Sequence, residues 1–175
     1  MNRGLIHIYH GNGKGKTTSG IGLCIRAAGA NLKVLIYQFL KDNDSSERKI
    51  LSNIPGITLE EGKEKIKFIF KMSQEEKNKA AIFYGEEFER ISKKAEEEAF
   101  DVLFFDEILH LINYGLLEEE RVITFLENKP EKLEVIMTGY EPSKRLLELG
   151  DYVSCIQKEK HPFDKGISAR KGIER

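Results

Sequence analysis

A glycine-rich loop carries the strongest chemical signal in the sequence. The loop lies directly after an apolar run and directly before a stretch of helical period, and it reads Gly11-Asn12-Gly13-Lys14-Gly15-Lys16-Thr17-Thr18. Backbone N–H groups of such a loop, the positive end of a helix dipole, a lysine ammonium and a threonine hydroxyl on Mg²⁺ together bind a polyphosphate. The pattern predicts a P-loop in which Lys16 contacts phosphate and Thr17 contacts the metal. His10 stands where the usual pattern has its first glycine, so the loop is a variant, and a turn that only caps a helix is the alternative.

Two carboxylates, Asp106 and Glu107, follow the apolar run at residues 102–105. Such a run is typical of a central strand buried on both faces, and carboxylates at the end of a parallel strand face the ligand crevice. A hard carboxylate opposite a P-loop can bind Mg²⁺ or orient its water. We expect this strand to neighbour the P-loop strand and one of the two carboxylates to support the metal. The alternative is a polar pair that merely ends the strand.

The elements that must position these residues alternate between short apolar, β-branched runs and longer segments of helical period. This alternation is typical of a parallel α/β sheet. We expect strands at 5–9, 34–39, 57–59, 102–105, 133–137 and 152–157, and helices at 16–28, 48–51, 73–98, 118–126 and 143–149. A capping box at Ser73 and Glu76 begins the longest helix, and Pro142 suits the first turn of the last one.

Residues 68–70 are expected to form a short extended piece, and the polar tail 161–175 a loop or an arm. The whole chain, residues 1–175, is therefore expected to be a single α/β domain. It would have three layers, with a mostly parallel sheet covered by helices on both faces. This is the architecture of RecA-like P-loop NTPases.

Composition excludes several classes of function. The 175 residues include 28 Lys and Arg against 29 Asp and Glu, a formal net charge of -1, which argues against a nucleic-acid partner. No window approaches the roughly 18 apolar residues that span a bilayer, and the chain start lacks a signal-peptide core, so we expect no membrane partner and a cytoplasmic protein. Cys24 and Cys155 stand apart, outside any C-x-x-C pair. We expect two buried free thiols rather than a zinc site or a disulfide.

Several further segments, added to the two motifs above, resemble one known family. These segments are Gln38-Phe39, Thr138-Gly139, Lys160-His161-Pro162-Phe163, Lys165-Gly166-Ile167 and Gly172-Ile173-Glu174. Together they resemble the ATP-dependent corrinoid adenosyltransferases of the P-loop type, also called cob(I)yrinic acid a,c-diamide adenosyltransferases. The resemblance covers nearly the whole chain. A generic P-loop enzyme would share only the glycine-rich loop and the carboxylate pair.

The resemblance implies an enzyme that transfers the 5′-deoxyadenosyl group of ATP to the Co(I) centre of a reduced corrinoid and releases triphosphate, in adenosylcobalamin biosynthesis or salvage. It also implies a nucleotide that lies reversed in the P-loop, with the γ-phosphate where other P-loop proteins hold the β-phosphate. Co(I) is a strong nucleophile, so the protein needs no base and must instead position the reactants and neutralise the departing triphosphate. The catalytic residues would be Lys16, Thr17 and Glu107. Thr17 would hold Mg²⁺ with Asp106 or Glu107, and Lys14 would join Lys16 on phosphate oxygens.

Three departures from the family pattern concern the corrinoid side. Only residues 1–4 precede the first strand, where family members carry a segment that helps cover the corrinoid. Tyr140 stands where the family has arginine after Thr-Gly. The nearest counterpart of the family's Phe-x-Trp pair is Phe68-Ile69-Phe70. Phe68 and Phe70 would face one side of an extended piece and displace the lower axial ligand of the corrinoid, which makes four-coordinate Co(II), and so Co(I), more accessible. The alternative places both in the core.

The resemblance also implies partners. These are MgATP, cob(I)alamin or one of its precursors, a reduced flavoprotein as electron donor, and a second copy of the chain in a homodimer. Two other classes of function stay open, namely a P-loop kinase or NTPase and a non-catalytic ATP-binding module. His110 and His161 are candidates for general bases or cobalt ligands, although a lone histidine is more often a hydrogen-bonded surface or core residue.

Overall fold

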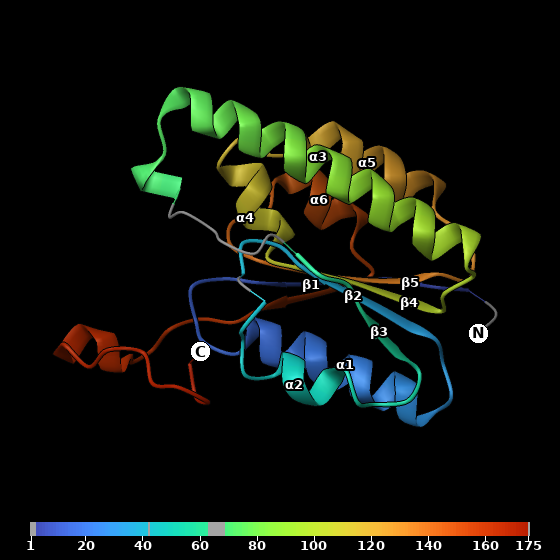
Figure 1. Cartoon of the computed structure of the whole chain (residues 1–175), viewed down its shortest axis with the longest axis horizontal. Coiled ribbons are helices and arrows are strands. Elements are labelled where there is room, and N and C mark those ends of the chain that lie inside the picture. Colours follow the sequence, from blue (N-terminus) through green and yellow to red (C-terminus); the bar gives the residue numbers. More distant parts are fainter. Residues whose placement is uncertain (1–2, 42, 63–68, 175) are drawn as a thin grey trace.

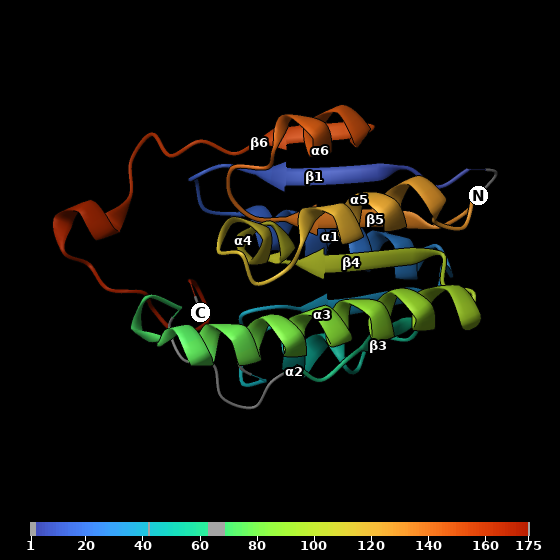
Figure 2. The same ribbon diagram turned by 90° about the horizontal axis from the view of Figure 1, so that it is seen from above.

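A six-stranded sheet forms the centre of the molecule in the computed structural model, which describes residues 3–41, 43–62 and 69–174. The paired strands of the described chain are all parallel, and the strand order is β3-β2-β4-β5-β1-β6. The strands are β1 (Ile6–His10), β2 (Val34–Gln38), β3 (Ile57–Leu59), β4 (Val102–Asp106), β5 (Glu134–Thr138) and β6 (Tyr152–Cys155). Since all run the same way, their carboxyl ends share one edge of the sheet (Figure 2).

Helices cover both faces of this sheet, so the molecule has three layers (Figure 1). One face carries α1 (Lys16–Gly29) and α2 (Arg48–Leu51), and the other carries α3 (Gln74–Glu97), α4 (Ile108–Asn113), α5 (Glu119–Asn128) and α6 (Lys144–Leu149). The expected three-layer α/β architecture is therefore confirmed. None of the helices described is long and apolar enough to cross a membrane.

The core forms on both sides of β4, whose five residues are all buried, as the unbroken apolar run predicted. Gly20 of α1 lies against the ring of Phe104, and a Cβ at this position would stand 2.5 Å from Phe104 Cζ. Helix α1 therefore starts at the end of β1 and crosses over β5 to pack on β4. This crossing matters for the site, because β5 separates β1 from β4 and the expectation that they are neighbours is wrong.

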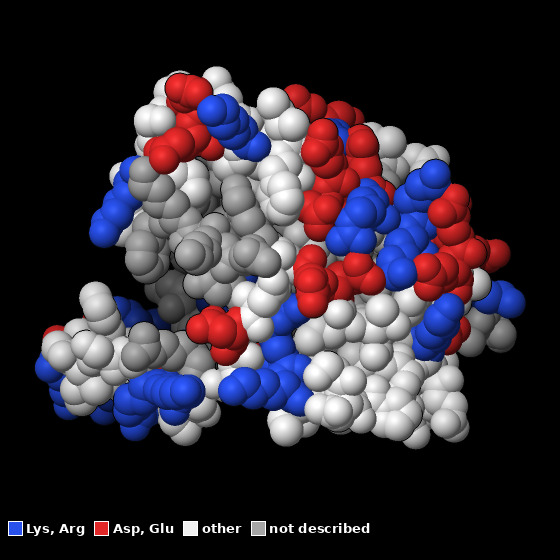
Figure 3. Space-filling view, in the orientation of Figure 1, with Lys and Arg blue, Asp and Glu red and all other residues white. Residues whose placement is uncertain are grey.

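The longest helix begins as its sequence predicted. Ser73 is the N-cap of α3, its hydroxyl accepts from Glu76 N, and the Glu76 carboxylate accepts from Ser73 N at 2.7 Å. The outer face of α3 carries mixed acidic and basic side chains (Figure 3), among them the ion pair Lys94–Glu98. These charges form a solvated helix face.

Three local expectations were wrong, and the α4 helix had no expected counterpart. Residues 69–71 form a 3₁₀ helix, η1 (Ile69–Lys71), instead of an extended piece, and Phe68 lies outside the described residues. The α6 helix begins at Lys144, because Ser143 is its N-cap and accepts from Leu146 N, so Pro142 precedes the helix. Cys24 is buried as expected, but Cys155 is exposed because β6 is an edge strand.

The tail is an arm, as expected. After β6 the chain leaves the sheet and forms a single 3₁₀ turn, η2 (Pro162–Lys165), beyond the carboxyl ends of the strands (Figures 1 and 2). His161 caps this turn, because its Nδ1 accepts from Phe163 N at 3.2 Å. The contact gives His161 a structural role in this turn.

Candidate nucleotide and metal site

The glycine-rich loop has the backbone conformation that its sequence predicts. Gly11 and Gly15 have φ of 108° and 118°, in the left-handed region that glycine adopts without strain. The loop also lies against the chain after β6: Gly13 N donates to Ile156 O at 2.8 Å, and the Asn12 carboxamide accepts from Lys158 N at 2.8 Å. A Cβ at Gly13 would stand 2.9 Å from Ile156 O, so the loop backbone fits closely there. The loop therefore ends at the N-terminus of α1 in a fixed shape.

Lys16 and Thr17 form the first turn of α1, at the positive end of its dipole. Lys16 Nζ donates to Gly13 O at 2.8 Å, which folds the side chain back over the loop. Burial lowers the pKa of Lys16, and attraction to Glu107 and Asp106 offsets part of this effect. The ammonium thus stands over the loop that would cradle phosphate.

Asp106 is the centre of a buried polar cluster and is 0% exposed. Its Oδ1 accepts from Thr17 Oγ1 at 2.9 Å and from Thr138 Oγ1 at 2.6 Å. Its Oδ2 accepts from Lys41 Nζ at 2.6 Å and from Gln38 Nε2 at 3.2 Å. Asp106 therefore contacts the P-loop helix directly, while its hydroxyl, amide and ammonium partners hold the carboxylate in one orientation.

Of the two carboxylate residues, Glu107 has the unusual backbone conformation. Its φ of 63° is left-handed, which is uncommon outside glycine, and its N–H donates to Thr138 Oγ1 at 2.8 Å. Burial, with repulsion from Asp106, raises the pKa of the Glu107 carboxyl to about 7. The two carboxylates therefore differ in environment. Asp106 contacts Thr17 and Lys41 directly, whereas Glu107 lies at the start of α4.

The raised pKa of Glu107 predicts a pH dependence of stability. Between its ordinary pKa of 4.5 and about 7, the folded protein holds a proton that the unfolded chain has lost. The contribution of Glu107 to the free energy of unfolding should therefore fall as pH rises through this window, by about 3 kcal/mol at most. We expect urea unfolding in a chelator to show this loss between about pH 5 and pH 8 in the parent and not in Glu107→Gln. The control is Glu86→Gln, which changes an exposed carboxyl. If the free energy of unfolding had the same pH slope in the parent and in Glu107→Gln, the prediction would be contradicted.

Three residues of the cluster were not among the expected site residues. Lys41 and Glu47 come from the polar loop after β2, and Gln38 ends β2 itself. Glu47 Oε1 accepts from Gln38 Nε2 at 3.0 Å and lies 3.4 Å from Lys41 Nζ, and Arg48 donates to Gln38 Oε1 at 3.2 Å. The polar character of residues 41–46 was the signal available, but it is the same signal that any loop gives.

The oxygen atoms of this cluster suit a hard divalent cation. Asp106 Oδ2 is a carboxylate oxygen and Thr17 Oγ1 is a hydroxyl oxygen. Mg²⁺ binds such oxygen ligands together with substrate phosphates. The ammonium of Lys41 stands 2.6 Å from the first and 3.4 Å from the second, so a positive charge already fits between them. Among residues 3–41, 43–62 and 69–174, no group of three or more His, Cys, Asp or Glu side chains is arranged to hold a metal ion.

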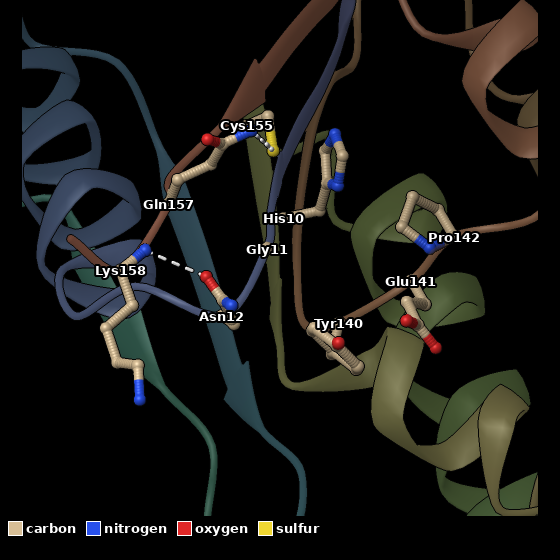
Figure 4. Close-up of a pocket in the computed structure, with 9 residues that line it drawn as sticks. All are labelled: His10, Gly11, Asn12, Tyr140, Glu141, Pro142, Cys155, Gln157 and Lys158. Carbon is tan, nitrogen blue, oxygen red and sulfur yellow. Dashed lines mark hydrogen bonds between the residues drawn. The ribbon is translucent and has the colours of Figure 1, made fainter. Parts of the chain in front are cut away.

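A cavity of about 410 Å³ adjoins the P-loop at the carboxyl ends of β1, β5 and β6 (Figure 4). Its lining residues are His10, Gly11, Asn12, Tyr140, Glu141, Pro142, Cys155, Gln157 and Lys158. His10, which replaces the usual first glycine of the P-loop, faces this cavity. Burial, then repulsion from Lys16, lowers the pKa of His10 and favours its neutral form. The cavity is thus a mixed polar and aromatic space continuous with the phosphate loop.

The remaining candidates come from α4, η1, the P-loop and the start of α1. Burial and Lys16 lower the pKa of His110 on α4, and its buried Nδ1 has no hydrogen-bond partner among the residues described. Phe70 in η1 is 79% exposed, so the core alternative is wrong for this side chain. Lys14 is exposed on the P-loop, and Thr18 is exposed on α1. The structure thus brings together Lys16, Thr17, Asp106 and Glu107.

Solved structures of P-loop ATPase domains share this fold. EssC (ATPases 2 and 3) from Geobacillus thermodenitrificans superposes with a TM-score of 0.51 at 16% identity, over 97% of this chain and 35% of that one. The cytoplasmic domain of EssC gives 0.53 at 15% identity, over 98% and 37%. The chain spans little more than a third of these proteins, and at such identity the likeness shows the fold alone. Fold and loop together define a P-loop protein of the α/β class.

The sequence comparison assigns the family. The family model for ATP:corrinoid adenosyltransferase BtuR/CobO/CobP matches residues 2–175, and the chain therefore belongs to this family. It is 32% identical to the corrinoid adenosyltransferase of Escherichia coli K12, over 98% of this chain and 86% of that protein. Corrinoid adenosyltransferase CobA of Salmonella typhimurium is 31% identical over the same shares of the two chains.

Proposed function

We propose that this protein transfers the 5′-deoxyadenosyl group of ATP to the Co(I) centre of a reduced corrinoid and releases triphosphate. Family membership over nearly the whole chain is the observation that carries the proposal. The contact of Thr17 with Asp106 at the head of the P-loop helix supports the nucleotide part of it, because a P-loop needs such a hydroxyl and carboxylate beside the phosphates.

In this reaction the chain's own residues bind and orient, and none has to remove a proton. The Co(I) substrate attacks the ribose 5′ carbon, the C5′–O bond breaks, and its electron pair leaves with the triphosphate. Lys16 and the P-loop N–H groups would neutralise the charge that grows on this leaving group. Thr17 with Asp106 or Glu107 would hold Mg²⁺, which when bound offsets further phosphate charge. A reacting pair held in line gains most of its rate from this positioning.

The cavity beside the P-loop is our candidate for the nucleoside part of ATP. It begins at His10 and Gly11, so a nucleotide with its terminal phosphates in the loop could extend its ribose into this space. Tyr140 from the end of β5 offers an aromatic face there (Figure 4). This placement agrees with a reversed nucleotide, whose 5′ carbon points away from α1 toward the carboxyl edge of the sheet.

An anaerobic assay tests the function. Parent protein, MgATP and chemically reduced cobalamin should give loss of the Co(I) absorbance together with stoichiometric triphosphate. Formation of phosphate and ADP without loss of Co(I) would instead show a P-loop kinase or NTPase. ATP binding without any product would show a non-catalytic module.

The proposed contact with the corrinoid involves Phe70 and Phe68. Phe68 lies outside the described residues. Phe70 is a large apolar side chain in η1 that is 79% exposed to solvent. Because its side chain is exposed, Phe70 is available to pack against the face of a flat apolar ligand. We propose that both rings contact the corrinoid and displace its lower axial ligand.

Phe70→Ala should therefore leave stability within about 0.5 kcal/mol of the parent, since the side chain is exposed. We expect it to suppress the four-coordinate Co(II) signal in electron paramagnetic resonance while ATP affinity stays unchanged. Ile82→Ala, which truncates an exposed apolar side chain on α3, is the matched control. An undiminished signal in Phe70→Ala would refute the assignment.

The remaining partners complete the proposal. Reduction of the corrinoid to Co(I) needs an electron donor, for which we propose a reduced flavoprotein. We also propose that the protein works as a homodimer in the cytoplasm. A cytoplasmic location fits the free thiols of Cys24 and Cys155, because a reducing compartment preserves free thiols.

A further inference from the structure

Lys41 occupies the place of a cation in the phosphate site. Its Nζ lies 2.6 Å from Asp106 Oδ2, 3.4 Å from Thr17 Oγ1 and 3.4 Å from Glu47 Oε1. Three oxygens from three separate elements thus surround one ammonium. Its side chain is only 18% exposed, and that of Asp106 is fully buried.

Electrostatics explains why this ammonium stays in place. A fully buried carboxylate without a cationic partner is strongly unfavourable. Burial is the largest single influence and would lower the pKa of Lys41. Attraction to Asp106, the hydrogen bond to it, and attraction to Glu107 and Glu47 together outweigh burial and raise this pKa, so the side chain remains a cation. The same oxygens are those that suit a divalent metal, and two cations cannot both lie within about 3 Å of one carboxylate oxygen without strong repulsion.

We propose that Lys41 is an internal counter-cation that excludes free metal from the site. Its ammonium neutralises Asp106 in the nucleotide-free protein and must leave this carboxylate when a divalent metal binds. Metal therefore binds weakly by itself and strongly together with ATP, whose phosphates bring the negative charge that two neighbouring cations require. The inference deepens the proposed function and rests on the assignment of Asp106 and Thr17 to the metal.

The first experiment measures metal binding without nucleotide or corrinoid. Binding of Mn²⁺, followed by electron paramagnetic resonance at a pH near 8, should be at least about tenfold tighter in Lys41→Met than in the parent, because no charged hydrogen-bonded partner has to be displaced. Without metal, Lys41→Met should melt at a lower temperature than the parent, and Mn²⁺ should raise its melting temperature more. Lys79→Met, which removes an exposed, ion-paired lysine of α3, should match the parent. Unchanged or weaker Mn²⁺ binding by Lys41→Met overturns the proposal.

The second experiment uses the parent protein, so it does not depend on whether the variant folds. Acetylation of lysines, mapped by mass spectrometry, should be slow at Lys41 in metal-free protein and several-fold faster with saturating Mn²⁺, while labelling of Lys79 stays constant. A Lys41 rate that does not change with metal overturns the proposal. Neither experiment involves adenosyl transfer, so a failure here with normal transfer refutes the role of Lys41 alone. If both experiments on Lys41 gave the expected results but the protein showed no adenosyl transfer, only the proposed function would be refuted.

Discussion

Lys16→Ala should lower kcat/KM for MgATP by about 10²-fold or more, the loss that follows removal of one donor to a developing negative charge. The ammonium stands over the P-loop, where Lys16 Nζ contacts Gly13 O, and we propose that it neutralises the departing triphosphate. Steady-state rates of adenosyl transfer at saturating reduced corrinoid measure the effect. Stability should change little, because the side chain anchors only a backbone carbonyl of its own loop.

Lys14→Ala is the control for Lys16, because it removes the same charge from the same loop. Lys14 is exposed, so solvent screens its charge, and we expect a loss of less than about tenfold. Equal effects of the two substitutions would mean that the loop acts through its net charge. Parental rates and ATP affinity in Lys16→Ala would refute the P-loop assignment.

Asp106→Asn should lower metal-dependent turnover by about 10²-fold or more. The amide keeps the shape of the side chain but removes the charge that Thr17, Thr138 and Lys41 surround. Because Lys41 would lose its buried partner, we also expect the free energy of unfolding in a chelator to drop by about 3 kcal/mol. Urea denaturation and Mg²⁺ titration of the transfer rate measure the two effects separately.

A double variant distinguishes the proposed metal role of Asp106 from its structural role. Asp106→Asn with Lys41→Met removes both buried charges, so most of the lost stability should return while turnover stays low. If activity returned together with stability, Asp106 would be a structural residue only. Glu107 would then be the carboxylate that supports the metal.

Much of the architecture follows from local sequence patterns. The apolar run before Asp106 identified a strand buried on both faces, and the capping box at Ser73 located the start of α3. These features depend on neighbours a few residues apart, which is why periodicity and caps reveal them. The sequence pattern did not predict short elements such as α4 and η1, because one or two turns carry too little periodicity to distinguish a helix from a loop.

The sequence by itself determined the P-loop and the carboxylate pair, and the likeness of its short motifs to one family indicated the chemistry. Only the tertiary structure decided that β5 separates β1 from β4, that Asp106 rather than Glu107 contacts Thr17, and that Lys41 lies on Asp106. Thr17 and Lys41 are 89 and 65 residues away from Asp106 along the chain. Such contacts depend on the order of strands in the sheet and on the path of α1 across it. Global packing fixes both, and no local propensity encodes them.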